Sequence, residues 1–372
     1  MKIINKRLLF CILLSWATVA AVFAMNPGEK IRSGDVVSED WLSSPRSVLL
    51  EIRVDIKVED VLSTQPLAEH NKKLGIPENT PPRLLFWSSD IMDHFGQQNV
   101  KCLKCEPAPD KEAVEPENGN RILFWDFSNE AALGRSFKIV RVYSLINHAI
   151  LPRLNKDQKL NYDQENLEVL FYTKSEPFVK LTPEIREAAQ KAKGDASSPL
   201  VQAGKIFQWV RNYMEYEYPP PGGRGATVAL REKRGDCGQY ADLFIALCRS
   251  AGIPARFAAG FTLPDPKTGK TRLGAHAWAE FMLPDGTWVP ADPTREKEQY
   301  FARSLINTHI TSSVGRNILL PKAPPWARYG FSDVEGGRTE FMQTLTELKS
   351  GLRAEVSITR RILPHPPEKG EP

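Results

Sequence analysis

A cysteine at the expected start of a helix is the residue whose position most strongly suggests chemistry. Cys237 follows Gly235 and Asp236 in the stretch RGDCGQYADLFIALCRSAGIPARF. A helix N-terminus presents unpaired N–H groups and the positive end of the helix dipole, and both favour a thiolate over a thiol. The same N–H groups could stabilise an oxyanion. Cys237 is therefore a candidate nucleophile; the alternative is a buried or spare thiol.

The segment around Cys237 predicts a helix over residues 236–250, which Gly252 and Pro254 bring to an end. Its apolar residues recur at three- and four-residue steps and form one stripe: Tyr240, Leu243, Phe244, Leu247, Cys248 and Ala251. Cys248 is accordingly predicted to be a core thiol. It cannot pair with Cys237, because the intervening helix separates their Cα atoms by about 16 Å, which is beyond disulfide reach.

A thiolate nucleophile also needs a proton carrier and a group that orients this carrier. His276 and Asp292 lie in LGAHAWAEFMLPDGTWVPADPT, which reads as strand, turn and strand. A three-residue loop with Gly286 left-handed would make His276 and Asp292 diagonal neighbours on one face. A two-residue loop would put them on opposite faces. Taken singly, they also fit an ordinary strand histidine and a turn residue.

Three motifs therefore follow one another along the chain: GDCGQYADLFIALCRSAGIPARFAAGF, AHAWAEF and GTWVPADPT. Together they resemble the transglutaminase-like superfamily over residues 181–295. The resemblance implies a papain-like α+β core, with Cys237 as the nucleophile, His276 as the general base and acid, and Asp292 as the residue that orients His276.

The chemistry that this resemblance implies is acyl transfer at a peptide or carboxamide bond, through a thioester on Cys237. Water as acceptor gives hydrolysis, and a lysine amine gives cross-linking. Water is the default acceptor in an open cleft, so we expect a peptidase or amidase. Cross-linking, or a non-catalytic binding module that retains the fold, are the alternatives. Candidates for a second oxyanion donor are Trp209, Tyr216 and Tyr218. Because the sequence shows no acidic loop of the calcium-binding type, we expect no metal and no other cofactor.

Ahead of the motifs, the chain reads as a series of strands. Apolar and charged residues alternate along residues 47–58 (SVLLEIRVDIKV), as in a half-buried strand. Further strands are predicted at residues 83–87, 121–127, 136–145 and 166–173. Several strands without interleaved helices favour an antiparallel β-sandwich. Since this region carries no titratable cluster, we assign it a supporting or recognition role.

Helical periodicity begins after these strands. Residues 183–193 predict a helix that starts after Thr182 and stops at Gly194, and residues 197–218 contain a second helix. The expected organisation is a signal peptide (1–24), a linker (25–45), a β-rich N-terminal domain (46–178), a transglutaminase-like catalytic domain (179–312), and a C-terminal extension and tail (313–372). A final hairpin is expected within this extension, in LKSGLRAEVSITRRIL.

The N-terminal residues indicate export. A basic start is followed by a mostly apolar run to Ala24, with small residues at the positions that a signal peptidase needs. We therefore expect a periplasmic or secreted protein; the alternative is an uncleaved membrane anchor. Removal of Lys2, Lys6 and Arg7 reduces the formal charge from +4 to +1. That charge gives no reason to expect nucleic acid as a partner, and the expected partner is a peptide or protein substrate.

Cys102 and Cys105 in NVKCLKC form a second, local pair of cysteines. In an oxidising compartment a disulfide between them is the first expectation. Free thiols, or a metal or redox role, are the alternatives.

Overall fold

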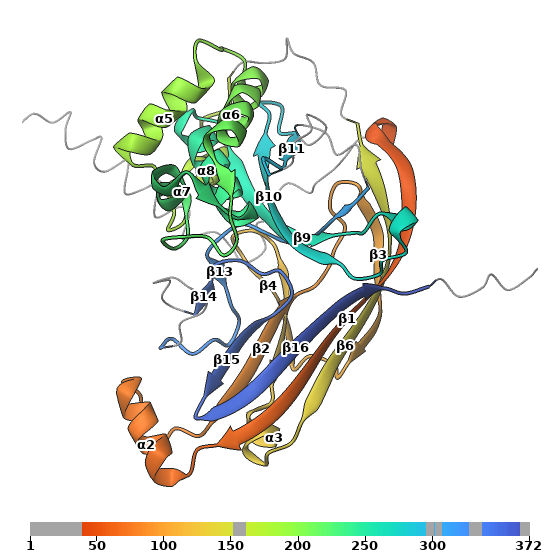
Figure 1. Cartoon of the computed structure of the whole chain (residues 1–372), viewed down its shortest axis with the longest axis vertical. Helices are drawn as coiled ribbons and strands as arrows, with labels where there is room; N and C mark the ends of the chain where they lie inside the picture. The colour runs from red at the N-terminus through yellow and green to blue at the C-terminus, as the bar shows by residue number, and fades with distance from the viewer. Residues whose placement is uncertain (1–38, 152–160, 295–300, 302–306, 327–336, 365–372) are drawn as a thin grey trace, which may run out of the picture.

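The described part of the chain forms a β-sandwich and a smaller sheet covered by helices (Figure 1). The computed structural model describes residues 39–151, 161–294, 301, 307–326 and 337–364. The expected signal peptide and most of the expected linker lie outside these ranges. Among the helices within them, none combines the length and the apolar character needed to cross a membrane.

Two four-stranded antiparallel sheets make up the sandwich. The first has the order β16 (Leu352–Ile362), β1 (Leu42–Val61), β6 (Phe137–Ile150) and β3 (Gln97–Glu106). The second has the order β15 (Thr346–Ser350), β2 (Arg83–Ser89), β5 (Arg121–Asp126) and β4 (Lys111–Val114). The predicted fold class, α+β with an antiparallel sandwich, is thus confirmed.

Strand β1 buries one face in its middle part, from Val48 to Ile56, as its alternating sequence predicts. Val48, Leu50, Ile52, Val54 and Ile56 are each at most 2% exposed. These residues belong to two different cores: the first three pack against a separate sheet that includes Phe261 and Ile310, and the last two pack inside the sandwich. The sandwich therefore also supports that separate sheet.

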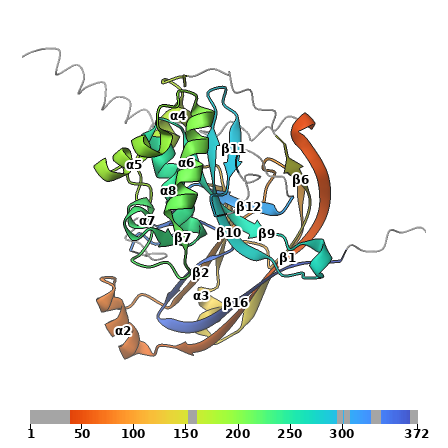
Figure 2. The same ribbon diagram turned by 45° about the horizontal axis from the view of Figure 1, so that its top comes forward.

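A third sheet, also four-stranded and antiparallel, carries helices on one side (Figure 2). Its order is β11 (Trp288–Ala291), β10 (Gly274–Met282), β9 (Ala255–Thr262) and β12 (His309–Val314). The helices of this unit are α4 (Leu167–Thr173), α5 (Pro183–Lys193), α6 (Pro199–Tyr213), α7 (Ala226–Glu232) and α8 (Cys237–Ser250). Smaller elements are η1 (Glu39–Trp41), α2 (Thr64–Lys73), α3 (Ser128–Ala132), β7 (Glu215–Tyr216), β8 (Arg234–Gly235), η2 (Pro266–Thr268), β13 (Ile318–Leu319) and β14 (Arg338–Thr339).

Capping residues fix the ends of the predicted helices. The side chain of Thr182 accepts a hydrogen bond at the start of α5, and Gly194 ends this helix with a φ of 55°. Helix α8 begins at Cys237, is capped by Asp236, and is followed by Gly252 with a φ of 80°. Both helices therefore lie where the sequence predicts them.

The prediction of a strand over residues 166–173 is wrong, because these residues form helix α4. The side chain of Asn166 accepts hydrogen bonds from the backbone N–H groups of Glu168 and Val169, which is an N-cap. An apolar run of this length fits a buried helix as well as a strand, and the cap decides between them.

Both ends of the sandwich also differ from expectation. The segment expected as a C-terminal hairpin instead supplies β15 to one sheet and β16 to the other, with a turn at Gly351, whose φ is 70°. At the other end, β1 already starts at Leu42, inside the expected linker. A bulge between Ser43 and Arg46 hides this start, because it interrupts the alternation.

A buried ion pair ties helix α8 to the chain beyond β12. Arg316 Nη2 lies 2.6 Å from Asp242 Oδ2 on α8, and both side chains are at most 1% exposed. The guanidinium also lies over the rings of Phe178 and Phe257, at 4.2 and 4.4 Å from their centroids. The pair thus anchors α8 to the segment that returns toward the sandwich.

Loss of one partner should therefore destabilise the fold. Arg316→Met leaves Asp242 buried without its counter-ion, and we expect the free energy of unfolding to fall by about 3–5 kcal/mol in urea titrations. The control is Lys191→Met, which removes an exposed pair with Glu187 and should cost less than about 0.5 kcal/mol. Equal, small losses in both variants would contradict the anchoring role.

Candidate active site

Cys237 is the first residue of α8, and its environment is that of an accessible thiol at a helix N-terminus. The side chain is partly exposed. Asp236 caps the helix, with its carboxylate accepting from the N–H groups of Gly238 and Gln239 at 3.0 and 3.3 Å. The Cys237 side chain lies close enough to His276 to help raise the pKa of the imidazole. The helix start therefore brings the candidate nucleophile and its proton carrier together.

The hairpin that carries His276 and Asp292 has the register that a three-residue loop requires. The Leu283 N–H donates to the Thr287 carbonyl at 2.8 Å, and Gly286 has a φ of 88°. His276 on β10 and Asp292 after β11 then meet, with Nε2 of the histidine 2.7 Å from Oδ2 of the aspartate. The predicted loop and the predicted proximity are both observed.

A second histidine, which sequence reasoning missed, contacts the same carboxylate. His309 Nε2 on β12 lies 3.1 Å from Asp292 Oδ2. The other carboxylate oxygen, Oδ1, accepts from the Thr294 hydroxyl at 2.5 Å and from the Thr294 N–H at 3.2 Å. No spacing rule links His309 to the three motifs, since it arrives from a strand beyond them.

Burial and charge together set the protonation of this cluster. Burial alone would lower the pKa of His276, but the charge and hydrogen bond of Asp292, together with Cys237, raise it to about 9. Burial opposes ionisation of Asp292 as well, yet the two histidines hold the pKa of this carboxyl well below its usual range. The geometry therefore favours an imidazolium beside the thiol and a carboxylate behind it.

The two histidines and Asp292 also present three metal-ligand atoms within 4.8 Å of one another. A zinc ion held by these atoms would have to fit between them, with each ligand about 2.0–2.2 Å from the ion. Here the carboxylate oxygen already lies at hydrogen-bonding distance from both Nε2 atoms, at 2.7 and 3.1 Å. We therefore interpret the cluster as hydrogen-bonded imidazoles on one carboxylate.

The backbone N–H of Cys237 is the first candidate donor to an oxyanion. Asp236 occupies the next two N–H groups of the helix, whereas the described contacts give that of Cys237 no acceptor. Strand β7 pairs with β8, which ends two residues before Cys237, and both Tyr216 at the end of β7 and the nearby Tyr218 are exposed. Trp209 instead stacks on Tyr213 at 4.2 Å, which is a packing role.

Other residues of the three motifs have structural roles. Cys248 is fully buried in the core of the helical unit, and Gln239 is also buried, where its amide donates to the Gly223 carbonyl at 3.0 Å. Trp278 stacks on His276 with centroids 6.0 Å apart. Trp288 does not reach the site, because its indole N–H donates to Glu168.

Cys102 and Cys105 are free thiols in β3, so the disulfide expected between them is not formed. Their sulfur atoms donate to the carbonyl groups of Lys104 and Pro107 instead. Desolvation raises the pKa of Cys105 to about 11, which makes it a poor thiolate at neutral pH. Their environment offers neither the helix start nor the histidine that Cys237 has.

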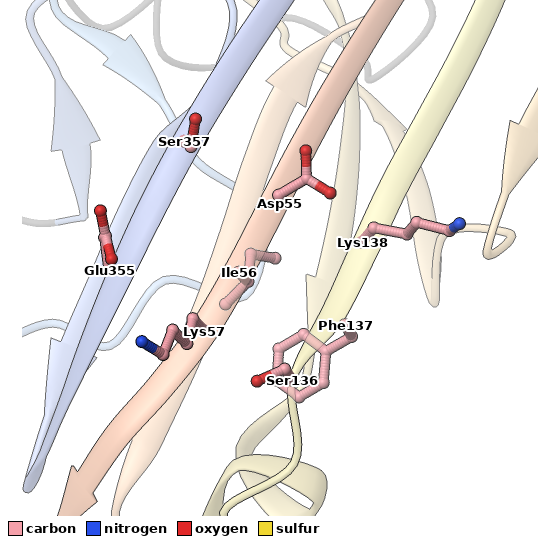
Figure 3. A pocket seen from close by; sticks show the side chains of 8 residues that line it. All are labelled: Asp55, Ile56, Lys57, Ser136, Phe137, Lys138, Glu355 and Ser357. Carbon is pink, nitrogen blue, oxygen red and sulfur yellow. The ribbon is translucent and has the colours of Figure 1, made fainter.

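A pocket on the sandwich lies apart from this site (Figure 3). Its lining comes from β1, β6, β16 and the residue before β6, and it includes Asp55, Lys57, Lys138 and Glu355. Because its charges are mixed in sign and none of Cys237 and its partners lines it, we assign it no part in the chemistry.

The raised pKa of His276 predicts a specific dependence of stability on pH. A histidine titrates near 6.5 when unfolded, so the protonated ring stabilises the fold fully below that pH. This stabilisation should be lost as the pH rises through about 9. In urea titrations, the free energy of unfolding should fall by about 3 kcal/mol between about pH 6 and pH 10, and this fall should be missing in His276→Gln. Parallel curves for the two proteins would contradict this protonation.

Comparison with known proteins agrees with the geometry. Residues 186–293 match the family model described as the transglutaminase-like superfamily. A solved structure from Cytophaga hutchinsonii, described as that of a proposed cysteine protease, has a TM-score of 0.51 with 13% identity. The alignment covers 87% of this chain and 99% of that chain, and it shows a shared fold.

Curated relatives match over shorter segments. An uncharacterised protein of Haemophilus influenzae is 31% identical over 150 residues, which are 35% of this chain and 41% of the relative. A protein-glutamine gamma-glutamyltransferase of Pseudomonas aeruginosa is 30% identical over 122 residues, covering 30% of this chain and 18% of the relative. The chain thus spans well under half the length of these relatives. Residues 186–293, which contain Cys237, His276 and Asp292, are a domain of the transglutaminase-like superfamily.

Proposed function

We propose that the protein is an exported cysteine enzyme that transfers acyl groups from peptide or carboxamide bonds, with water as the usual acceptor. The observation that carries this proposal is the chain of contacts from Cys237 through His276 to the buried Asp292. A non-catalytic scaffold has no need of a buried carboxylate that keeps a proton on a histidine beside a thiol.

In the first half of the proposed reaction, the Cys237 thiolate attacks the carbonyl carbon of the substrate. The carbonyl oxygen becomes an oxyanion, which the Cys237 N–H stabilises. As the tetrahedral intermediate collapses, the C–N bond breaks and protonated His276 gives its proton to the departing amine or ammonia. The product is a thioester on Cys237, and His276 is left neutral.

In the second half, neutral His276 takes a proton from water, and the resulting hydroxide attacks the thioester carbonyl. The C–S bond breaks, the carboxylic acid leaves, and the thiolate and imidazolium are restored. Asp292 stays ionised throughout and holds the ring of His276 by the 2.7 Å hydrogen bond. Cys237 is partly exposed, so water can reach the thioester.

Cross-linking is the second candidate, and it uses the same residues. A lysine amine would replace water in the second half and give an isopeptide bond. The local similarity to a protein-glutamine gamma-glutamyltransferase favours this candidate. The partial exposure of Cys237 admits either acceptor, so the outcome depends on which one reaches the thioester first.

Export is part of the proposal and rests on the basic and apolar segment that ends at Ala24. An enzyme in that compartment would meet secreted or cell-wall peptides as substrates. The mass of the protein recovered from its host cells tests the point, since cleavage removes residues 1–24, whereas an uncleaved anchor retains them.

The reaction class can be tested with a mixed pool of peptides. Wild-type protein, Cys237→Ala and Cys102→Ala are each offered peptides containing Gln, Asn and many different peptide bonds, together with a small primary amine and a reductant. Mass spectrometry reads the products. We expect wild type and Cys102→Ala to form cut or deamidated peptides, and Cys237→Ala to be slower by at least about a thousandfold.

Each outcome of this experiment has a distinct meaning. Amine adducts in place of hydrolysed products would identify a transferase on the same residues. Products that persist at the wild-type rate in Cys237→Ala would contradict a Cys237 nucleophile. A lack of turnover by every protein, together with a Cys237 that resists alkylation, would favour the binding scaffold.

A further inference from the structure

His309 occupies a position in the site that the transglutaminase-like motifs do not supply. The family match ends at residue 293, and His309 opens strand β12, beyond it. Its side chain is 13% exposed and its Nε2 lies 3.1 Å from Asp292 Oδ2. The ring also lies edge-on to Trp278 with centroids 4.9 Å apart. His309 is thus held by two contacts, one with Asp292 and one with Trp278.

The fold makes room for this second imidazole at one glycine. Gly260 on β9 pairs with His276 on one side and with Thr311 on the other. A Cβ atom at Gly260 would lie 1.9 Å from the carbonyl oxygen of Ile310. Only a glycine therefore lets β12 approach β9 this closely, and the rings of His276 and His309 come to lie 5.5 Å apart.

The sandwich holds β12 in this place. Ile310, which follows His309, is fully buried in the core that also contains Val48, Leu50 and Ile52 of β1. Strand β12 pairs with β9 at the edge of the sheet opposite β11, and Figure 2 shows it next to β9. The position of His309 is therefore set by packing between the two units and not by the catalytic hairpin alone.

The hydrogen bonds around Asp292 indicate what His309 does. Thr294 holds Oδ1 with two hydrogen bonds, while Oδ2 receives both His276 and His309. The His309 Nδ1 lies 3.3 Å from the Thr308 hydroxyl. A neutral ring with its proton on Nε2 satisfies both contacts, because it donates to Asp292 and accepts from Thr308.

We propose that His309 is a positioning residue: its Nε2–H fixes Asp292 Oδ2 so that the carboxylate holds the ring of His276 toward Cys237. Without this donor, Oδ2 loses one of the two hydrogen bonds described above and can turn away from His276. The inference rests on the proposed role of Cys237 and His276. It adds a group from outside the three motifs and the family match to the machinery that orients the histidine.

A matched pair of variants separates hydrogen bonding from packing. His309→Gln keeps an N–H donor at a similar reach, whereas His309→Met keeps the length and the contact with Trp278 but donates nothing. We expect His309→Met to lower kcat by about tenfold to a hundredfold, with KM changed by no more than about twofold. His309→Gln should remain within about threefold of wild type. The two variants should unfold at similar urea concentrations.

A substrate-free measurement keeps this inference distinct from the proposed function. The rate of Cys237 alkylation by iodoacetamide near neutral pH is followed by peptide mass mapping in wild type, both His309 variants and His276→Ala. We expect slower alkylation in His309→Met and His276→Ala only. If His276→Ala alkylates as fast as wild type, the proposed function itself fails. Two results would overturn only the role of His309. In the first, His276→Ala is alkylated slowly but His309→Met at the wild-type rate. In the second, the alkylation rates of His309→Gln and His309→Met fall equally.

Discussion

A carboxylate taken out of water must be hydrogen-bonded on all sides, and the site depends on this constraint at Asp292. The residue is 3% exposed, and its two oxygens receive His276, His309 and both donor groups of Thr294. These contacts keep the charge in place although burial opposes it. The charge in turn keeps a proton on His276, whose ring meets Cys237. A neutral amide at this position could hold the ring but could not favour its protonated form.

The two units of the chain cooperate in holding these groups. Helix α8 brings Cys237, the hairpin of β10 and β11 brings His276 and Asp292, and β12 brings His309. A buried contact joins the units directly, since His94 beside the sandwich lies 2.7 Å from Glu280 on β10. The sandwich is therefore more than an attached domain, because its long strand β1 forms part of the surface on which the catalytic sheet packs.

The parts of the site that the sequence predicts are those set by local rules. The signals at both ends of the helix and the apolar stripe along it predict α8. The Pro-Asp-Gly turn fixes the register that brings His276 to Asp292. His309 was missed because tertiary packing, not spacing, brings it to Asp292. Helix α4 was mistaken for a strand for a related reason: a short apolar run carries no period that tells a buried strand from a buried helix. Long-range strand pairing likewise decides which sheets β15 and β16 join.

The most direct test of the account is an NMR titration of the His276 ring in wild type and in Asp292→Asn, with the signal assigned from its absence in His276→Gln. If the buried charge of Asp292 holds the proton, the wild-type ring should titrate near a pKa of about 9. In Asp292→Asn the pKa should fall toward the ordinary histidine value of about 6.5, because only Cys237 then opposes the effect of burial. A wild-type ring that titrates near 6.5, unchanged by the substitution, would contradict the central claim.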